Sequence, residues 1–488
     1  MTTMSISYCF NQTCIIRINM FTKTKVIATI GPSTNSYEKI KKMHKAGMNV
    51  VRINMSHANH VDGQATINHV KKLNKNEASL TNPIGILIDT QGPEIRTGIS
   101  QSDIDLKVGE IVNLTIRDDI DVETSSIKIN YKGLVKNVEK GSKISIDNGL
   151  INFKVLDKDN ENLKCKVLDG GTLGSKRHVN LPGVRVDLPS ITKKDRKDIN
   201  FAIKNSVSFI ALSFVRSAKD VEDLKSILRR KKSSAKIIAK IENQEGLDNI
   251  HEITKSADIV MVARGDLGIE TDLADLPNVQ RRIMYATAKW GRRSIVATHL
   301  LESMIKNPTP TRAEVTDVAN AIYEGADAVM LSGETSVGNN PVECVGMIKQ
   351  IANKTESFRT LEYERFLTDQ SDWQNIAIAA RDLASRINAD GIVIITRSGE
   401  TASVVSNTKP FRMPVFAFTN NIDTYQQLSI IGSVQPYFIN SISNKITTIE
   451  KIKSTLKLDR RLKKGSKFIL IAGVYSASHT DSIQIIST

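Results

Sequence analysis

Eight short apolar segments, separated by amphipathic stretches, most constrain what this chain can fold into. Each is rich in Val, Ile and Ala with few alternating polar positions, the pattern of a strand buried on both faces. Their starts lie roughly 22–36 residues apart, except for one gap of about 125, and a βα unit needs about 30 residues. Eight such units predict an α/β protein built on a (β/α)8 TIM barrel with one insertion. The segments span residues 25–31, 49–56, 84–90, 209–215, 236–242, 258–265, 294–300 and 327–334.

The insertion and the region after the eighth segment differ from the barrel. Short alternating segments separated by turn signals such as Asp147-Asn148-Gly149 predict an all-β insertion, which we expect to lie over the C-terminal mouth as a lid. Strand-like runs alternating with helical patterns predict a last α/β domain with a mostly parallel sheet. The predicted units are a disordered or misassigned leader (1–20), the barrel (21–91 and 187–354), a β-barrel lid domain (92–186) and a C-terminal α/β domain (355–488).

Composition narrows the function classes. The net charge is +15, but the basic residues are scattered and aromatics, at 5%, do not interleave with the short basic clusters, so we expect no nucleic-acid partner. No run approaches the roughly 18 apolar residues of a membrane span, so we expect no membrane partner. The 4 cysteines are too sparse for a disulfide framework, which favours a reducing, cytoplasmic location.

Polar residues follow six of the predicted barrel strands. In a TIM barrel the C-terminal strand ends and the loops after them build the active site, so polar groups there indicate catalysis. Burying charges without partners costs several kcal/mol per ion, so folding alone is a poor explanation for so many of them. The residues are Arg52, Asn54 and Ser56; Asp89 and Thr90; Lys240 and Glu242; Arg264, Gly265 and Asp266; Thr298 and His299; and Ser332 to Glu334.

Lys240, Glu242 and Asp266 suggest a divalent-cation site. Lys240 and Glu242 are two residues apart on one strand and therefore share a face, while Asp266 follows the next strand. One or two carboxylates, completed by water and substrate oxygens, are the usual protein ligands of Mg²⁺ or Mn²⁺. The structural alternative is a salt bridge between Lys240 and Glu242 alone.

The ends of the second and third strands suggest two further ligands. The oxygens of Asn54, Ser56, Asp89 and Thr90 suit a monovalent or hard cation, and Arg52 suits a phosphate or carboxylate. The alternative is a hydrogen-bonded polar plug.

Four histidines and one turn give weaker signals. We expect His57, His60 and His69 to be ordinary surface residues, and His299, close to the predicted site, receives no role. The 396–401 turn is as compatible with an anion site as with a plain strand–helix turn.

At these positions the chain resembles the pyruvate kinase family from about residue 22 to its end. The resemblance rests on strings such as TKVIATIGPST, GMNVVRINMSH, LIDTQGPEIRTG, KIENQEG, MVARGDLG and GADAVMLSGETSVGNNP. It implies the barrel, lid and C-terminal domain, the latter for effector binding or oligomerisation, and a homotetramer. It also implies phosphoryl transfer from phosphoenolpyruvate to ADP, giving pyruvate and ATP, with Mg²⁺ (or Mn²⁺) and K⁺.

The resemblance also implies residue roles. Arg52 resembles the phosphate contact, Lys240 the group that stabilises the enolate, and Thr298 a residue that helps to protonate it through water. The implied phosphoenolpyruvate site includes Arg52, Lys240, Gly265, Asp266 and Thr298. The implied ion ligands are Glu242 and Asp266 for Mg²⁺, and Asn54, Ser56, Asp89 and Thr90 for K⁺. The implied nucleotide contacts are Asn54, Met55, Ser56, His57, Arg96 and Lys194.

Four positions differ between branches of the family or depart from it. Glu94 resembles the branch that needs K⁺, whereas a lysine there would replace the ion. Gln91 stands where many relatives carry lysine, and His299 where glutamine is common. Glu400 places an acid in the turn that binds sugar phosphates in some relatives, which argues against activation by a sugar bisphosphate.

Two other functions are compatible with parts of this pattern. A metal-dependent enolate lyase or aldolase on a similar barrel would use the acidic ligands and an arginine, but would need neither the lid nor Lys240. An RNA-binding protein that kept the fold would require losses in the site, and the sequence shows none.

Overall fold

The computed structural model describes residues 21–76, 82–119, 122, 126–440, 442, 445–472 and 482–488. The predicted leader, with Cys9 and Cys14, lies outside these residues, as does the segment 473–481. Among the described residues, no helix combines the length and apolar character that crossing a bilayer requires.

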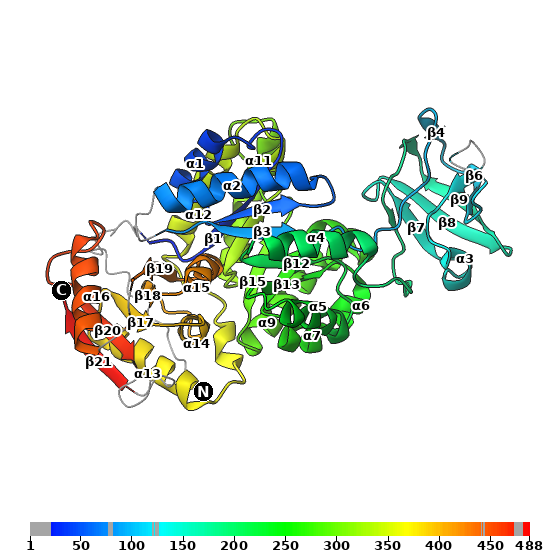
Figure 1. Cartoon of the computed structure of the whole chain (residues 1–488). Helices are drawn as coiled ribbons and strands as arrows, with labels where there is room; N and C mark the ends of the chain where they lie inside the picture. Colours follow the sequence, from blue (N-terminus) through cyan, green and yellow to red (C-terminus); the bar gives the residue numbers. More distant parts are fainter. Residues whose placement is uncertain are drawn as a thin grey trace, which may run out of the picture.

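All eight predicted strands form one closed parallel barrel. The strands neighbour each other in the order β1-β16-β15-β14-β13-β12-β3-β2, so the ring closes between β1 and β2. The predicted (β/α)8 barrel is therefore confirmed, with the insertion between β3 and β12 (Figure 1). The strands are β1 (Lys25–Thr29), β2 (Val50–Asn54), β3 (Gly85–Asp89), β12 (Phe209–Leu212), β13 (Lys236–Ile241), β14 (Ile259–Ala263), β15 (Arg293–Ala297) and β16 (Ala328–Leu331).

Alternate residues of each strand enter two separate cores. On β1, Val26 and Ala28 pack outward against the helices, while Ile27 packs into the barrel interior. The surrounding helices are α1 (Tyr37–Ala46), α2 (His60–Asn76), α4 (Lys193–Lys204), α5 (Ala218–Arg230), α6 (Gln244–Asp248), α7 (Ile250–Ser256), α8 (Arg264–Glu270), α9 (Leu276–Lys289), α10 (Arg312–Tyr323), α11 (Gly333–Ser336) and α12 (Pro341–Thr355), with 3₁₀ turns η1 (Leu273–Asp275) and η2 (Glu302–Ile305).

The interior face changes from apolar to polar toward the C-terminal strand ends. Apolar residues such as Leu87 and Ile238 fill the lower layers of the barrel. The next inward positions on the same two strands are Asp89 and Lys240. Because every strand runs in the same direction, these polar positions meet at one mouth of the barrel.

The insertion forms an open half-barrel rather than a closed β-barrel. Its main sheet has the order β11-β7-β8-β9-β5-β6, and its edge strands contain only two and three residues, too short to pair and close the sheet. Figure 1 places it beyond one end of the barrel. Its elements are β4 (Ile104–Leu106), β5 (Ile111–Thr115), β6 (Ser126–Lys128), α3 (Leu134–Asn137), β7 (Lys143–Ile146), β8 (Ile151–Lys158), β9 (Asn162–Asp169), β10 (Gly171–Leu173) and β11 (Val179–Asn180).

The C-terminal region has the predicted mostly parallel sheet and lies at the opposite end of the barrel (Figure 1). Four strands are parallel in the order β19-β18-β17-β20, and β21 adds an antiparallel edge that the sequence did not indicate. The elements are η3 (Tyr363–Phe366), α13 (Asp372–Arg386), β17 (Gly391–Ile395), α14 (Glu400–Asn407), β18 (Val415–Thr419), α15 (Ile422–Gln427), η4 (Leu428–Ile430), β19 (Val434–Phe438), α16 (Lys445–Leu458), β20 (Lys467–Ala472) and β21 (Ser482–Ser487).

Asp327 holds the C-terminal domain to the N-terminal ends of the barrel strands. Its buried carboxylate accepts hydrogen bonds from Lys409 Nζ of the C-terminal domain (3.0 Å) and from the backbone N–H of Ser294 (3.0 Å). Arg293, also buried, lies 3.4 Å from the same carboxylate and donates to Ser406 Oγ at 2.7 Å. Burial raises the pKa of Asp327, but Lys409 and Arg293 outweigh burial and hold it below its ordinary value.

We expect Asp327→Asn to lower the free energy of unfolding by about 3–5 kcal/mol, because it leaves the buried Arg293 and the partly buried Lys409 without their anion. Chemical denaturation followed by circular dichroism measures the change. The matched control is Asp382→Asn, because Asp382 pairs with Arg381 at the surface. We expect this control to lower the free energy of unfolding by less than about 1 kcal/mol. Equal effects of the two substitutions would contradict the role given to Asp327.

Candidate active site

Lys240 lies at the centre of the polar cluster in the barrel mouth. Its Nζ is 3.2 Å from Asp89 Oδ1, 3.0 Å from Glu242 Oε1 and 2.8 Å from Ser213 Oγ. Burial by itself lowers the pKa of Lys240, but the carboxylates of Asp89 and Glu242 reverse this and hold it above its ordinary value. Lys240 is therefore a permanently charged ammonium with only a small exposed surface facing the mouth.

Asp89 connects Lys240 to Arg52. Arg52 donates from Nε to Asp89 Oδ2 at 2.7 Å and from Nη1 to Thr29 Oγ1 at 2.9 Å. Burial raises the pKa of Asp89, yet Lys240 and Arg52 together hold it below its ordinary value. The carboxylate fixes two cations side by side, a geometry suited to binding one anionic substrate.

Glu242 and Asp266 face each other at the edge of this cluster. Glu242 accepts the backbone N–H of Phe214 at 2.5 Å. Burial, opposed by Lys240 and reinforced by Asp266, raises the pKa of Glu242 to about 7, and burial likewise raises that of Asp266. Among the described residues no three His, Cys, Asp or Glu side chains form a complete metal cluster, so a cation here would need further oxygens from water or substrate.

Arg264 fixes the loop that carries Thr298. Thr298 and His299 adopt left-handed backbone, with φ of 69° and 52°. Arg264 donates to the carbonyls of Thr298 (2.6 Å) and Ala297 (3.3 Å) and is itself held by Asp317 at 2.7 Å. The Thr298 hydroxyl accepts the N–H of Gly265 at 2.8 Å and donates to the Ala297 carbonyl at 2.6 Å. Thr298 and Gly265 are thus one rigid unit, whereas the His299 side chain is exposed.

The four oxygen-bearing residues predicted for K⁺ stand at the C-terminal ends of β2 and β3 or just beyond them. Asn54 and Asp89 are partners in the strand register. Asn54 Oδ1 accepts the N–H of Ser56 at 3.2 Å, and Thr90 Oγ1 donates to the Ala211 carbonyl at 3.1 Å. Ser56 Oγ reaches Glu94 Oε1 at 3.5 Å, so Glu94 lies beside this group.

The remaining predicted nucleotide contacts flank the mouth. Lys194 Nζ donates to the Met55 carbonyl at 2.6 Å and to Asp198 at 2.7 Å. Arg96 donates from Nε to Glu94 at 2.7 Å, and His57 is exposed. Lys194 thus contacts the loop after β2, and Arg96 is paired with Glu94, which lies beside Ser56.

Several other polar residues named from the sequence have structural partners. Glu334 is buried and accepts backbone N–H groups of Leu301 (3.1 Å) and Ser332 (2.7 Å). His60 contacts Asp198 at 2.7 Å, and His69 meets the ring of Tyr37 edge-on. The turn 396–401 ends β17 and opens α14.

Three groups of the site were not identified from the sequence. Ser213 contacts Lys240 but stands within an apolar run, where its position just past the strand end was the only signal. The Phe214 N–H acts through backbone, which no side-chain pattern reveals. His178 of the lid lies 3.6 Å from Asp266, a contact that depends on how lid and barrel dock.

Comparison with known proteins assigns both large units to one family. Residues 21–345 match the family model "Pyruvate kinase, barrel domain" and residues 374–486 match "Pyruvate kinase, alpha/beta domain". The pyruvate kinases of Staphylococcus aureus strains MRSA252 and USA300 are each 40% identical over 461 residues, which cover 93% of this chain and 78% of theirs. The crystal structure of a pyruvate kinase from Cryptosporidium parvum has a TM-score of 0.91 and 34% identity, covering 96% of this chain and 97% of that one.

We expect Lys240→Met to lower the free energy of unfolding by about 3–5 kcal/mol, because it leaves Asp89 and Glu242 buried without their shared cation. The double variant Lys240→Met/Glu242→Gln should cost at least about 0.5 kcal/mol less than the sum of the single variants. Urea unfolding of the unmodified chain, the two single variants and the double variant measures this double-mutant cycle. Lys236→Met, on the same strand but partly exposed, is the matched control. Strictly additive losses of stability in the double variant would contradict the coupling between Lys240 and Glu242.

Proposed function

Because the chain belongs to the pyruvate kinase family, we propose that the cluster around Lys240 is the site at which it performs the family's reaction. That reaction transfers the phosphoryl group of phosphoenolpyruvate to ADP and yields pyruvate and ATP, the final step of glycolysis. The observation that supports this site is the placement of Lys240 Nζ within 3.2 Å of both Asp89 and Glu242 at the barrel mouth.

Arg52 and Lys240 bind the anionic substrate. Phosphoryl transfer passes through a loose transition state in which positioning and charge neutralisation supply most of the catalysis. Arg52 faces the transferring phosphoryl group, and the Lys240 ammonium stabilises the oxygen that becomes the enolate. Since Asp89 already holds both cations, they need little rearrangement when the substrate arrives.

Glu242 and Asp266 hold Mg²⁺ or Mn²⁺. The donor set fits, because Asp266, at the start of α8, raises the pKa of the buried Glu242 carboxyl, and a shared divalent cation relieves that repulsion. When bound, the ion supplies Lewis-acid charge neutralisation next to the substrate. Asn54, Ser56, Asp89 and Thr90 hold K⁺, with Glu94 adding a carboxylate beside them.

Gly265, Asp266 and Thr298 line the remaining side of the phosphoenolpyruvate site. The Thr298 hydroxyl donates to the Ala297 carbonyl, so its own proton is occupied and its part is to position a water that protonates the enolate. Arg96 and Lys194 contact the nucleotide phosphates across the mouth, and the loop Asn54–His57 lies between them.

The chain assembles as a homotetramer in the cytoplasm. The segment after α12 exposes Phe358, Leu361 and Phe366 at 64%, 44% and 54%, an apolar surface suited to a subunit contact. Cys165 and Cys344 are buried free thiols, as expected of a protein in a reducing compartment.

We expect turnover of phosphoenolpyruvate and ADP in a lactate-dehydrogenase-coupled assay to require both Mg²⁺ and K⁺. Glu242→Gln should raise the Mg²⁺ concentration needed for half-maximal activity by about 10- to 100-fold, since it removes one carboxylate ligand. Glu252→Gln, an exposed glutamate on α7, is the matched control and should change nothing. An unchanged Mg²⁺ requirement in Glu242→Gln would refute the assigned ligand.

We expect Arg264→Met to lower kcat by about 100-fold with a small effect on the KM for ADP, because Thr298 and Gly265 lose the guanidinium that fixes their loop. Arg282→Met, at an exposed position of α9, controls for loss of a surface charge. If Arg264→Met shows wild-type kcat at saturating substrate, the loop does not depend on Arg264.

A further inference from the structure

Asp198 is a buried carboxylate of α4 that holds two basic side chains beside the barrel mouth. Its Oδ2 accepts a hydrogen bond from Lys194 Nζ at 2.7 Å, and its Oδ1 lies 2.7 Å from Nε2 of His60. The side chain of Asp198 is 4% exposed, whereas those of Lys194 and His60 are 45% and 44% exposed. One acid beneath the surface therefore holds two side chains that reach the solvent.

The ammonium of Lys194 is held from two sides. A lysine ammonium has three N–H donors, and the described residues accept two of them, at Asp198 and at the Met55 carbonyl (2.6 Å). The loop that carries Met55 is itself fixed, because the Met55 N–H donates to the Asp89 carbonyl at 2.9 Å. Immobilising a lysine side chain costs conformational entropy, and here that cost is met before a ligand arrives. The third donor is thus in place for an oxygen of an incoming anion.

His60 restrains the orientation of the Asp198 carboxylate. The His60 ring stacks on Phe201, which also belongs to α4, with ring centroids 4.5 Å apart and ring planes at 6° to each other. Stacking restrains the ring, so that Nε2 stays at Oδ1 of Asp198 and leaves Oδ2 to Lys194. The carboxylate is therefore fixed at both of its oxygens.

Fold stability is a poor explanation for this arrangement. A partly exposed ion pair four residues apart on a helix contributes little to stability. The helix already has a structural acid, because Asp195 forms a capping box with Thr192 and accepts the Gly92 N–H at 3.0 Å. Asp195 thus serves the backbone, whereas the partners of Asp198 are side chains.

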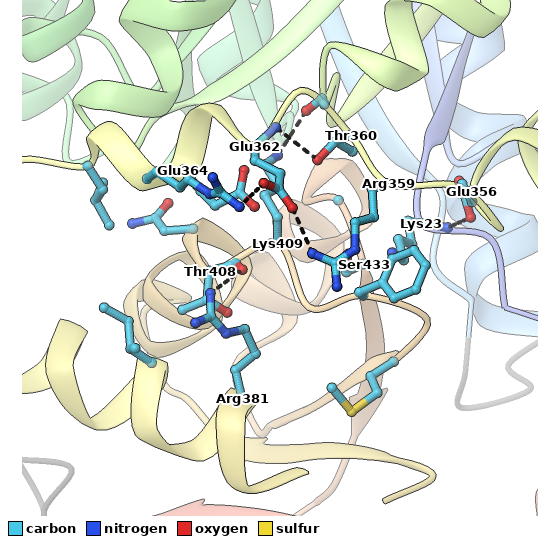
Figure 2. A pocket seen from close by; sticks show the side chains of 18 of the residues that line it. Lys23, Glu356, Arg359, Thr360, Glu362, Glu364, Arg381, Thr408, Lys409 and Ser433 are labelled. Atoms are coloured by element: carbon cyan, nitrogen blue, oxygen red, sulfur yellow. Dashed lines mark hydrogen bonds and ion pairs between the residues drawn. The ribbon is translucent and has the colours of Figure 1, made fainter. Parts of the chain in front are cut away.

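A second shared carboxylate shows how Asp198 differs from a local ion pair. In the cavity between the barrel and the C-terminal domain, Glu362 pairs with Arg359 at 3.0 Å and with Arg365 (Figure 2). All three residues stand on one short segment, so these pairs depend on local sequence. Asp198 instead meets His60 across 138 positions of the chain, so its two partners come together only because α2 and α4 lie side by side.

We propose that Asp198 is a positioning residue of the nucleotide site, which holds the Lys194 ammonium where it meets the phosphates of ADP. The proposal rests on the nucleotide contact of Lys194 proposed above. Asp198 does not contact the nucleotide itself: its charge keeps Lys194 in place, and Lys194 presents its third donor to a phosphate oxygen. Loss of the Asp198 charge therefore weakens the binding of ADP and leaves that of phosphoenolpyruvate unchanged.

Steady-state kinetics with ADP and phosphoenolpyruvate varied in turn tests this. We expect Asp198→Asn to raise the KM for ADP by about tenfold, while the KM for phosphoenolpyruvate and kcat change less than about twofold. Lys194→Met should raise the KM for ADP by at least as much. Because Asp198 acts through Lys194, the double variant should have the same KM for ADP as Lys194→Met alone. Asp223→Asn, at an exposed position of α5, is the matched control and should change none of these constants.

His60→Phe gives a second, milder variant. It keeps a ring stacked on Phe201 but removes the nitrogen that contacts Asp198, so we expect the KM for ADP to rise by about threefold. Because the His60 side chain is partly exposed, this variant decides the matter even if Asp198→Asn folds poorly, which thermal melting followed by circular dichroism reveals.

Three results would overturn the proposal: an unchanged KM for ADP in Asp198→Asn or, if that variant is unfolded, in His60→Phe; equal rises in the KM for both substrates; or additive effects in the double variant. Calorimetric titration with ADP requires no turnover and separates this failure from that of the proposed nucleotide site. If Lys194→Met weakens ADP binding and Asp198→Asn does not, only the role of Asp198 is wrong. If Lys194→Met binds ADP as the unmodified chain does, the Lys194 contact is wrong and the role of Asp198 fails with it.

Discussion

The chain of ion pairs Arg52–Asp89–Lys240–Glu242 is the constraint on which the rest of the active site depends. All four side chains are buried or nearly so, and buried ion pairs contribute little net stability compared with apolar packing of equal volume. Their arrangement is therefore better explained by preparation of a binding site than by stabilisation of the fold. It holds two cations beside a pair of carboxylates before any substrate is present, so binding requires little reorganisation.

The barrel positions these four ion-paired side chains because all of its strands run in the same direction. Inward positions near the strand starts are apolar and pack as layers, and the same positions further along carry Asp89 and Lys240. At the other end, Asp327 joins the strand starts to Lys409 of the C-terminal domain. The two ends of one rigid ring thus carry the candidate active site and the domain junction separately.

Much of this could be predicted from the sequence, for identifiable reasons. Eight buried strands at βα spacing specify the ring, and parallel strands bring their C-terminal ends together, which places Lys240, Glu242 and Asp89 in contact. Contacts made through docking or backbone carry no such signal. Ser213 looked like part of an apolar strand, His178 reaches Asp266 only because of the lid's position, and the half-barrel reflects edge strands too short to close.

The lid and the proposed cation site are connected through α8. Asp266 and Glu270 stand one turn apart on this helix, and Glu270 accepts hydrogen bonds from Asn180 Nδ2 (3.0 Å) and the Leu181 N–H (3.2 Å) of the lid. A shift of the lid therefore moves the helix that carries Asp266, and a cation bound by Asp266 as proposed would fix the helix to which the lid is bonded. With the proposed site, substrate binding and lid position would be coupled, because both act on the same seven-residue helix.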